Sequence, residues 1–196
     1  LDQFFNLSPD LLRIATTDGY SLRLNPAWER ILGYSREELM AKRFFDFVHP
    51  EDLEKTRQAV STLASQQKVI HFENRYRCKD GTYRWLEWTS APAGNLIYAA
   101  ARDVTERKQT EEARGERLQF EQLLSDLSAR FVNIPPDRVD STIEDALKQI
   151  LEFFRIDWCG LLQILRSQNS FRITHRASSG NVQDLPKGVE LHRSLF

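Results

Sequence analysis

Hydrophobic and polar positions alternate in two short runs near the start of the chain. Residues 11–16 and 20–24 show this alternation, and they flank Thr17-Asp18-Gly19. An alternation of period two is typical of a half-buried strand. Because Asp-Gly tolerates positive φ, the two runs predict a β-hairpin closed by a tight turn.

A second group of alternating runs occupies 69–78, 83–91 and 96–102. Lys79-Asp80-Gly81-Thr82 separates the first two runs and is a strong hairpin signal. Pro92 is expected to end the middle run, because proline cannot donate to a strand ladder. These runs predict an antiparallel meander of three strands, which brings the expected number of strands to five.

Helical signals fill the interval between the hairpin and the meander. Asn25 is expected to cap a helix over 27–32, with Pro26 at its start. Ser35-Arg36-Glu37-Glu38 resembles a capping box, and a longer helix is expected from Pro50 to about residue 66. This order predicts an α+β fold in which short helices cover one face of a five-stranded antiparallel sheet.

The second half of the chain changes to a long helical pattern over 103–132, ended by Pro135-Pro136. Apolar residues recur in this helix at spacings of seven, four, three and four, which predicts a short coiled-coil contact in a homodimer. We name these residues the seam: Ala113, Phe120, Leu124, Leu127 and Phe131. A helix over 140–154 and strands over 157–165 and 171–175 then begin a second α+β module.

The length of 196 residues allows one or two domains of about 150 residues. The patterns divide the chain into a first domain over 1–103, a connecting helix over 104–134 and the start of a second domain over 135–196.

Charge and cysteine content narrow the function classes. Lys plus Arg is 27 and Asp plus Glu is 28, and this balance gives no support for a nucleic-acid binder or a polybasic membrane anchor. No apolar run reaches the ~18 residues of a membrane helix, and no leader peptide is expected at Leu1. Cys78 and Cys159 are too few for a disulfide framework or a zinc site, so the cytoplasm is the expected compartment.

Several short motifs stand in an order that resembles the PAS sensor family over about residues 3–107. They are Asp18-Gly19, Asn25-Pro26-Ala27-Trp28, Leu32-Gly33-Tyr34-Ser35, His49-Pro50-Glu51-Asp52, Lys79-Asp80-Gly81, Arg84-Trp85 and Asp103-Val104-Thr105-Glu106-Arg107. The resemblance implies a sensory domain in which the sheet and its helices enclose a ligand pocket.

The remainder resembles, over fewer motifs, a signalling helix that enters the first part of a GAF domain. The matching residues are 146–151 and 157–162. A PAS–helix–GAF order is similar to the input end of a bacterial sensor histidine kinase of a two-component system, with the output domain in cis. Two alternatives stay open, namely the input region of a diguanylate cyclase-type protein and a ligand-free PAS scaffold for dimerisation.

Strand periodicity assigns the two faces of the meander, and the less charged face is expected to meet the helices. In the PAS family that face lines the ligand pocket. The resemblance therefore gives nine pocket candidates: Phe72, Asn74, Tyr76, Leu86, Trp88, Ser90, Ile97, Ala99 and Ala101. The alternative is a plain core, although a buried Asn74 or Ser90 would need a polar partner.

Particular cofactors can be checked against the residues. Cysteinyl-flavin photochemistry in PAS relatives needs a cysteine on the short-helix segment, and none lies between Asn25 and Gln66. Haem-binding PAS domains use a histidine on the long helix, which has none, since His49 precedes it and His71 follows it. Neither chemistry is expected, and the identity of any cofactor stays open.

The sequence shows no catalytic or metal-binding constellation. Cys78 and His71 form the nearest nucleophile–base pair, but seven residues along one strand separate them by about 20 Å. No glycine-rich phosphate loop, nucleophile elbow or zinc motif is present. We therefore expect no catalysis and no metal site in this chain.

The opposite face of the sheet offers a second surface. Trp85 is expected there, with Tyr98 nearby, either to receive the N-terminal segment 1–6 or a second PAS domain, or to lie half covered by arginine side chains. Asp103 and Thr105 join the last strand to the connecting helix. They are expected to relay a shift of the sheet into the seam.

Overall fold

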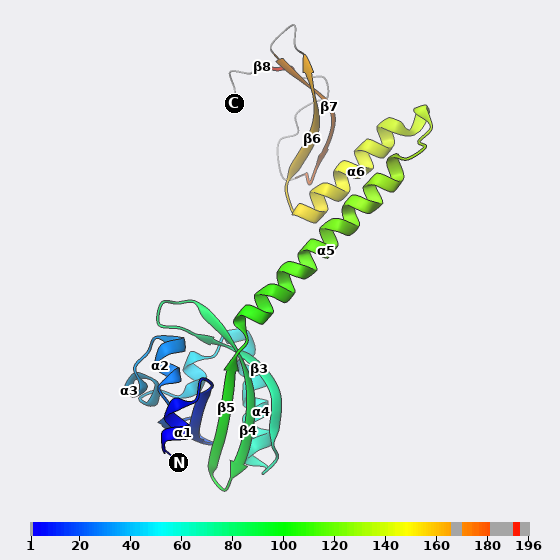
Figure 1. Cartoon of the computed structure of the whole chain (residues 1–196). Coiled ribbons are helices and arrows are strands. Elements are labelled where there is room, and N and C mark those ends of the chain that lie inside the picture. Colours follow the sequence, from blue (N-terminus) through cyan, green and yellow to red (C-terminus); the bar gives the residue numbers. More distant parts are fainter. Residues whose placement is uncertain (1, 166–169, 181–189, 193–196) are drawn as a thin grey trace. The chain divides into compact units, whose positions relative to one another are not determined.

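A computed structural model describes residues 2–165, 170–180 and 190–192 of the chain. It divides into two compact units, Leu1–Gly115 and Glu116–Phe196. The boundary falls inside helix α5, Thr105–Phe131, and the two units are described separately (Figure 1). Within the described ranges, no helix is both long and apolar enough to cross a membrane.

The first unit contains a five-stranded antiparallel sheet in the order β2-β1-β5-β4-β3. The strands are β1 (Leu11–Thr16), β2 (Ser21–Leu24), β3 (Val69–Arg77), β4 (Tyr83–Ala93) and β5 (Leu96–Asp103). The hairpin and the meander predicted from the sequence are both present, and β5 joins them by pairing with β1. The predicted α+β class and five-stranded antiparallel sheet are confirmed.

Short helices precede and follow the hairpin. They are α1 (Asp2–Leu7), α2 (Ala27–Leu32), α3 (Arg36–Met40), the 3₁₀ helices η1 (Phe44–Phe47) and η2 (Pro50–Asp52), and α4 (Leu53–Ala64). The predicted capping box at Ser35 is formed, because its hydroxyl accepts from the Glu38 amide while Glu38 accepts from the Ser35 amide. Leu1 lies outside the described residues.

One hydrophobic core joins these helices to one face of the sheet. Fully buried Trp28 and Leu32 of α2 belong to the same cluster as Leu11 of β1 and Leu86 of β4. Burial of such side chains contributes about 1.5–3 kcal/mol each to folding. The strand alternation therefore has its expected effect, because it places one side of each strand in this core.

Two local predictions are wrong. Strand β4 continues through Pro92 to Ala93, with Pro92 opposite Ile97. The described pairing of β4 with β3 ends at Ser90, so the missing N–H of Pro92 falls where β4 has no partner on that side. Asn25 does not cap α2 with its side chain. Its amide accepts from the Leu12 N–H and donates to the Asp10 carbonyl, each at 2.9 Å, and so joins β1 to the end of β2.

The second unit contains the rest of α5, the 3₁₀ helix η3 (Pro136–Arg138), helix α6 (Val139–Phe154) and an antiparallel sheet in the order β6-β7-β8. These strands are β6 (Trp158–Leu165), β7 (Ser170–Ser178) and β8 (Glu190–His192). Ala146 and Leu147 of α6 are buried, as are Ile173 and Ala177 of β7. An α+β module therefore follows α5, as the helical and strand patterns predict.

Candidate functional site

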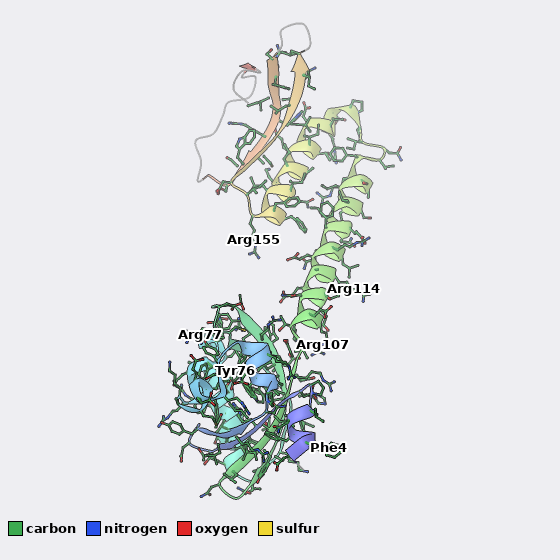
Figure 2. The ribbon with its side chains drawn as sticks, turned by 60° about the vertical axis from the view of Figure 1, so that its left-hand side comes forward. Phe4, Tyr76, Arg77, Arg107, Arg114 and Arg155 are labelled. Atoms are coloured by element: carbon green, nitrogen blue, oxygen red, sulfur yellow. The ribbon has the colours of Figure 1, made fainter. Side chains whose placement is uncertain are left out.

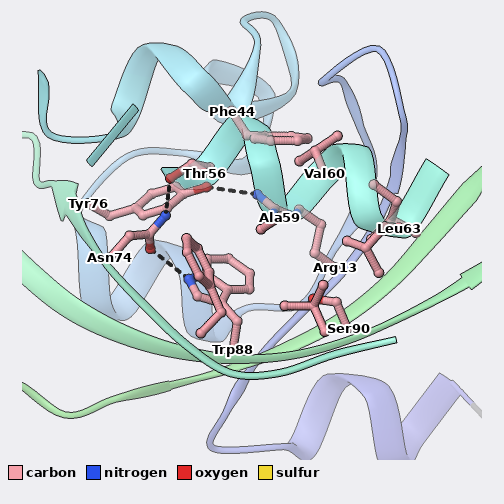
Figure 3. A pocket seen from close by; sticks show the side chains of 13 residues that line it. Arg13, Phe44, Thr56, Ala59, Val60, Leu63, Asn74, Tyr76, Trp88 and Ser90 are labelled. Carbon is pink, nitrogen blue, oxygen red and sulfur yellow. Dashed lines mark hydrogen bonds between the residues drawn. The ribbon is translucent and has the colours of Figure 1, made fainter. Parts of the chain in front are cut away.

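A small cavity lies in the first unit between α4 and the inner face of the sheet (Figure 3). It leaves about 30 Å³ for the centres of water-sized groups. Six of the nine pocket candidates line it: Phe72, Asn74, Tyr76, Trp88, Ser90 and Ile97. The other three, Leu86, Ala99 and Ala101, are buried in the core on the same face of the sheet but do not reach the cavity.

A chain of hydrogen bonds satisfies the buried polar groups at one end of the cavity. Trp88 Nε1 donates to Asn74 Oδ1 at 2.7 Å, and Asn74 Nδ2 donates to Thr56 Oγ1 at 3.0 Å. Thr56 Oγ1 donates in turn to the Asp52 carbonyl at 2.6 Å. Asn74 thus has the polar partners that its burial requires, and these bonds connect β4, β3 and α4.

Arg13 is a residue of the cavity that the sequence reasoning missed. Its side chain points inward from β1, and the residue is only 7% exposed. The guanidinium carbon lies 4.3 Å from the Phe44 ring centroid and 4.5 Å from that of Trp88, while Nη1 donates to Tyr76 Oη at 3.2 Å. The signal was available, because Leu11, Arg13 and Ala15 alternate with Leu12 and Ile14 and so share the buried face.

Tyr76 and Trp88 form an aromatic wall of the cavity beside Arg13, and Trp28, which does not line the cavity, packs against both rings. Ring centroids of Trp28, Tyr76 and Trp88 lie 5.5–6.0 Å apart in tilted and edge-on arrangements. Such pairs add about 0.5–1.5 kcal/mol beyond the area that they bury. The rings therefore hold Tyr76 and Trp88 in fixed orientations against the guanidinium.

Next to the cavity, an ion pair joins η2 to β3. Asp52 is 3% exposed and accepts from the Arg75 backbone amide at 2.8 Å and from Arg75 Nε and Nη2 at 2.9 Å. Burial alone would raise the pKa of the Asp52 carboxyl, but hydrogen bonds from Arg75 and Lys55 hold that pKa well below its usual range. The Asp52 carboxylate thus stays charged and binds η2 to Arg75 of β3. Its backbone carbonyl is the last acceptor of the hydrogen-bond chain that begins at Trp88.

The two predicted relay residues lie where β5 passes into α5. Asp103 Oδ1 accepts from the Thr105 amide at 2.9 Å and from Thr105 Oγ1 at 2.5 Å. Thr105 Oγ1 itself accepts from the backbone amide of Trp85 at 2.9 Å, and the Trp85 carbonyl accepts from Val104 N–H. The first turn of α5 is therefore bonded to β4 as well as to β5.

Ion pairs add a further connection between the sheet and the start of α5. Glu73 of β3 accepts from Arg107 at 2.8 Å and from Lys108 at 2.6 Å. The hydrogen bond from Lys108, together with the charges of Lys108 and Arg107, keeps the pKa of Glu73 below its ordinary value. The Glu73 carboxylate on the outer face of β3 thus holds the first turn of α5.

Trp85 lies half-buried on the outer face, where three cations surround its ring. Arg75, Lys108 and Lys55 lie 5.2, 5.4 and 5.6 Å from the ring centroid. Tyr98 is exposed, but it pairs with Ala91, six residues along β4 from Trp85, or about 20 Å away. The expectation that the two aromatic residues lie near each other is therefore wrong.

The N-terminal helix α1 contacts β2. Arg23 lies with its guanidinium 4.4 Å from the Phe5 ring centroid, and it also forms an ion pair with Asp2. Phe4 points away from the unit and is exposed (Figure 2). Among these residues, α1 therefore contacts Arg23 of β2, whereas the sequence suggested a contact with Trp85.

Within the second unit, the seam residues have different surroundings. Phe120 lies 6.1 Å from Phe153 and 6.2 Å from Phe154 between ring centroids, so one seam residue packs on α6 of its own chain. Leu124 and Phe131 are exposed, and Leu127 is half-buried. Ala113, which belongs to the first unit, is exposed.

The histidines of the first unit, His49 and His71, do not line the cavity, and neither does Cys78. His49 accepts from the Glu51 amide at the start of η2, and His71 lies 3.2 Å from Glu87 on the outer face. Cys78 is a buried free thiol, and burial raises the pKa of the Cys159 thiol. In the described part of the chain, no group of three or more His, Cys, Asp or Glu side chains is placed to hold a metal ion.

Comparison with known proteins identifies the class of the first unit. Residues 21–97 match the family model of the PAS fold. With the five-stranded antiparallel sheet, its covering helices and the inner-face cavity, this match shows that the first unit is a PAS domain, which is a sensory module.

Individual relatives extend the comparison. Over 108 residues the chain is 32% identical to the probable diguanylate cyclase DgcE of Escherichia coli strain K12, a match that covers 52% of this chain and 10% of that protein. The chain thus spans about a tenth of this curated relative. A solved RNA-binding light-oxygen-voltage receptor is 22% identical with a TM-score of 0.50, over 63% of this chain and 36% of the receptor. A domain of a sensory box sensor histidine kinase/response regulator from Geobacter sulfurreducens is 20% identical with a TM-score of 0.48, over 52% and 90% of the two chains.

Proposed function

We propose that this chain is the signal-input region of a bacterial signal-transduction protein whose output domain lies in cis. The PAS cavity receives the signal as a small molecule, and the sheet passes it to α5. The observation that supports this most is the junction at Trp85, Asp103 and Thr105, where the strands that border the cavity are hydrogen-bonded to the first turn of the helix.

The relay needs a rigid connection between cavity and helix. Trp88 lines the cavity and lies three residues along β4 from Trp85, whose amide donates to Thr105. A displacement of Trp88 is therefore transmitted along one strand to the start of α5. From there, the displacement would change the register of two α5 helices in a homodimer, which would meet at the exposed seam residues Leu124 and Phe131.

For the output, we propose a histidine kinase, because the order of a PAS domain, a helix and a GAF-like α+β module is similar to the input end of such kinases. A diguanylate cyclase is the second candidate, and the observation that supports this candidate is the 32% identity to a probable cyclase. We place the protein in the cytoplasm, in keeping with its two free thiols. A ligand-free scaffold is the third alternative.

The test of this proposal uses the full-length protein that contains this chain. Asp103→Ala should change the basal output activity, because it removes both acceptor bonds at the junction. Glu106→Ala, an exposed change in the same helical turn, is the matched control and should leave that activity unchanged. An output activity that is the same in Asp103→Ala and in the wild type would overturn the relay. Incubation with ATP or with GTP separates a kinase, which phosphorylates itself, from a cyclase, which forms a cyclic dinucleotide.

A further inference from the structure

The cavity contains a buried cation that has no anionic partner among the described residues. Arg13 is more than nine-tenths buried, and none of the described ion pairs includes it. Its Nε is buried without a hydrogen-bond partner. A guanidinium is always protonated in proteins, and burying an unpaired charge is strongly unfavourable. The aromatic rings of Phe44 and Trp88 compensate for only part of this cost.

The arrangement around Arg13 leaves one edge of its guanidinium open. Phe44 and Trp88 lie against the guanidinium at 4.3 and 4.5 Å, and Nη1 is bonded to Tyr76 (Figure 3). Nε and Nη2 donate to no acceptor in the described part of the chain. These two groups form the edge with which arginine binds a carboxylate through two parallel hydrogen bonds.

Two further donors lie on the same cavity wall. Tyr76 Oη accepts from Arg13, and its own proton is not donated to any described residue. Ser90 is buried, lines the cavity, and its hydroxyl makes no hydrogen bond to the residues that the structure describes. Asn74, Thr56 and Trp88, in contrast, already satisfy one another. The unused donors therefore gather on the side of Arg13.

We propose that this cavity binds a short-chain aliphatic monocarboxylate, of the size of acetate or propionate, on Arg13. This inference rests on the proposed input function and names the chemical class of its signal. The cavity leaves about 30 Å³ for the centres of water-sized groups, so in this arrangement of side chains it favours a small ligand over a large one. Apolar Ala59, Val60 and Leu63 of α4 line the rest of the cavity and match a methyl or ethyl group.

The charge of the lining sets the charge of the ligand. Of the described residues that line the cavity, Arg13 alone carries a charge. One carboxylate neutralises it, whereas a second carboxylate would lie unpaired among apolar side chains. A monocarboxylate should therefore bind more tightly than a dicarboxylate, and more tightly than the amide of the same shape.

The experiment records proton–nitrogen spectra of the arginine Nε–H and tryptophan indole groups of the whole chain during titration at constant ionic strength. Sodium propionate should give a saturable shift of the Arg13 Nε–H signal and of the Trp88 indole signal. Propionamide, which keeps the shape without the charge, should bind about 10- to 100-fold more weakly. Equal binding of the two, or no binding of propionate, would overturn the assignment.

Variants give a second and independent readout. Arg13→Gln should lose at least tenfold in propionate affinity, and Arg13→Lys should lose less, because it keeps the charge but not the fork. Arg23→Gln is the matched control, since Arg23 lies on β2 outside the cavity, and its affinity should equal that of the wild type. Propionate affinity unchanged in Arg13→Gln would overturn the inference. The wild-type titration against propionamide decides the question if Arg13→Gln does not fold.

This inference and the proposed function fail in different measurements. If propionate does not bind but the output activity still depends on Asp103, the proposed carboxylate site is refuted and the proposed input function stands. If propionate binds but the output activity does not depend on Asp103, the carboxylate site stands and the proposed relay is refuted.

Discussion

Thr105 Oγ1 accepts a hydrogen bond of 2.9 Å from the backbone amide of Trp85, which stands twenty residues earlier in the chain. The same hydroxyl donates to Asp103, so one side chain joins β4, the end of β5 and the first turn of α5. The indole of Trp85 lies on the outer face among three cations, while its backbone makes this connection. The residue thus acts through its backbone at the junction and through its ring on the surface.

Replacing Thr105 by Val keeps the shape of the side chain and removes both hydrogen bonds of the hydroxyl. The Trp85 amide then loses its partner, and we expect a loss of about 1–3 kcal/mol in the free energy of unfolding. Amide hydrogen exchange at Trp85 should become faster. Thr110→Val is the control, because the Thr110 hydroxyl is exposed and bonds only within α5. Equal protection of the Trp85 amide in both variants would contradict the assigned role.

Asn74→Ala tests the hydrogen-bond chain beside the cavity. The change leaves Trp88 Nε1 without an acceptor and opens space in a packed core. We expect a loss of about 2–4 kcal/mol in the free energy of unfolding, measured by urea denaturation. Asn95→Ala, in the exposed turn between β4 and β5, should change it by less than about 0.5 kcal/mol. Similar losses in the two variants would show that the buried network contributes nothing.

Asp52→Asn tests the ion pair between η2 and β3 through its pH dependence. The pKa of Asp52 is lowered in the folded state, whereas the unfolded value is about 3.9. The unfolded chain therefore binds more protons in acid, so this contribution is present above about pH 4 and is lost as the pH falls below that value. Removing one partner of a buried pair should cost about 3 kcal/mol at pH 7.

The comparison for Asp52 is denaturation of wild type and variant between pH 3 and pH 7. The difference between their stabilities should be largest near neutrality and should shrink toward pH 3. Asp46→Asn changes an exposed carboxylate in the preceding 3₁₀ helix and should follow the wild type at each pH. A difference that stays constant across this range would refute the assigned charge of Asp52.

Gly19→Ala tests the turn of the first hairpin. Gly19 has φ of 101°, and a Cβ there would lie 2.9 Å from Phe45 Cε2. Gly81 has φ of 89° with no atom within 4 Å of such a Cβ, so Gly81→Ala isolates the backbone strain. We expect a loss of about 1 kcal/mol for Gly81→Ala and about 1–3 kcal/mol more for Gly19→Ala. Thermal unfolding of both variants measures the difference, and equal losses would contradict the predicted clash.

The strands and turns were predictable because their signals are local. One buried face imposes a period of two on β1, β3, β4 and β5, and Asp-Gly marks the turns between β1 and β2 and between β3 and β4. The same alternation placed Asn74 and Trp88 on the inner face. Arg13 holds the corresponding inward position on β1, but charged side chains normally lie outward, so its residue type argues against the buried place that it takes.

Two features of the structure depend on contacts between residues that are far apart in the sequence, and the sequence pattern does not predict them. Trp85 and Tyr98 share the outer face, but the register of β4 with β5 separates them. Phe120 has the heptad-like spacing of a seam residue in α5. Its ring packs against Phe153 and Phe154 of α6, and the sequence pattern of α5 alone does not reveal these partners. Neither the register nor the helix pairing has a signature within its own segment.

The sequence by itself determined the element order, the strand alternation, the hairpin turns and the motifs of the PAS domain, because each depends on residues that are neighbours in the chain. Only the tertiary structure decided that the inward position of β1 brings a guanidinium between Phe44 and Trp88 with an unused donor edge. The physical reason is that a buried charge is defined by what surrounds it, and its surroundings come from η1, β3 and β4, which the fold alone brings together.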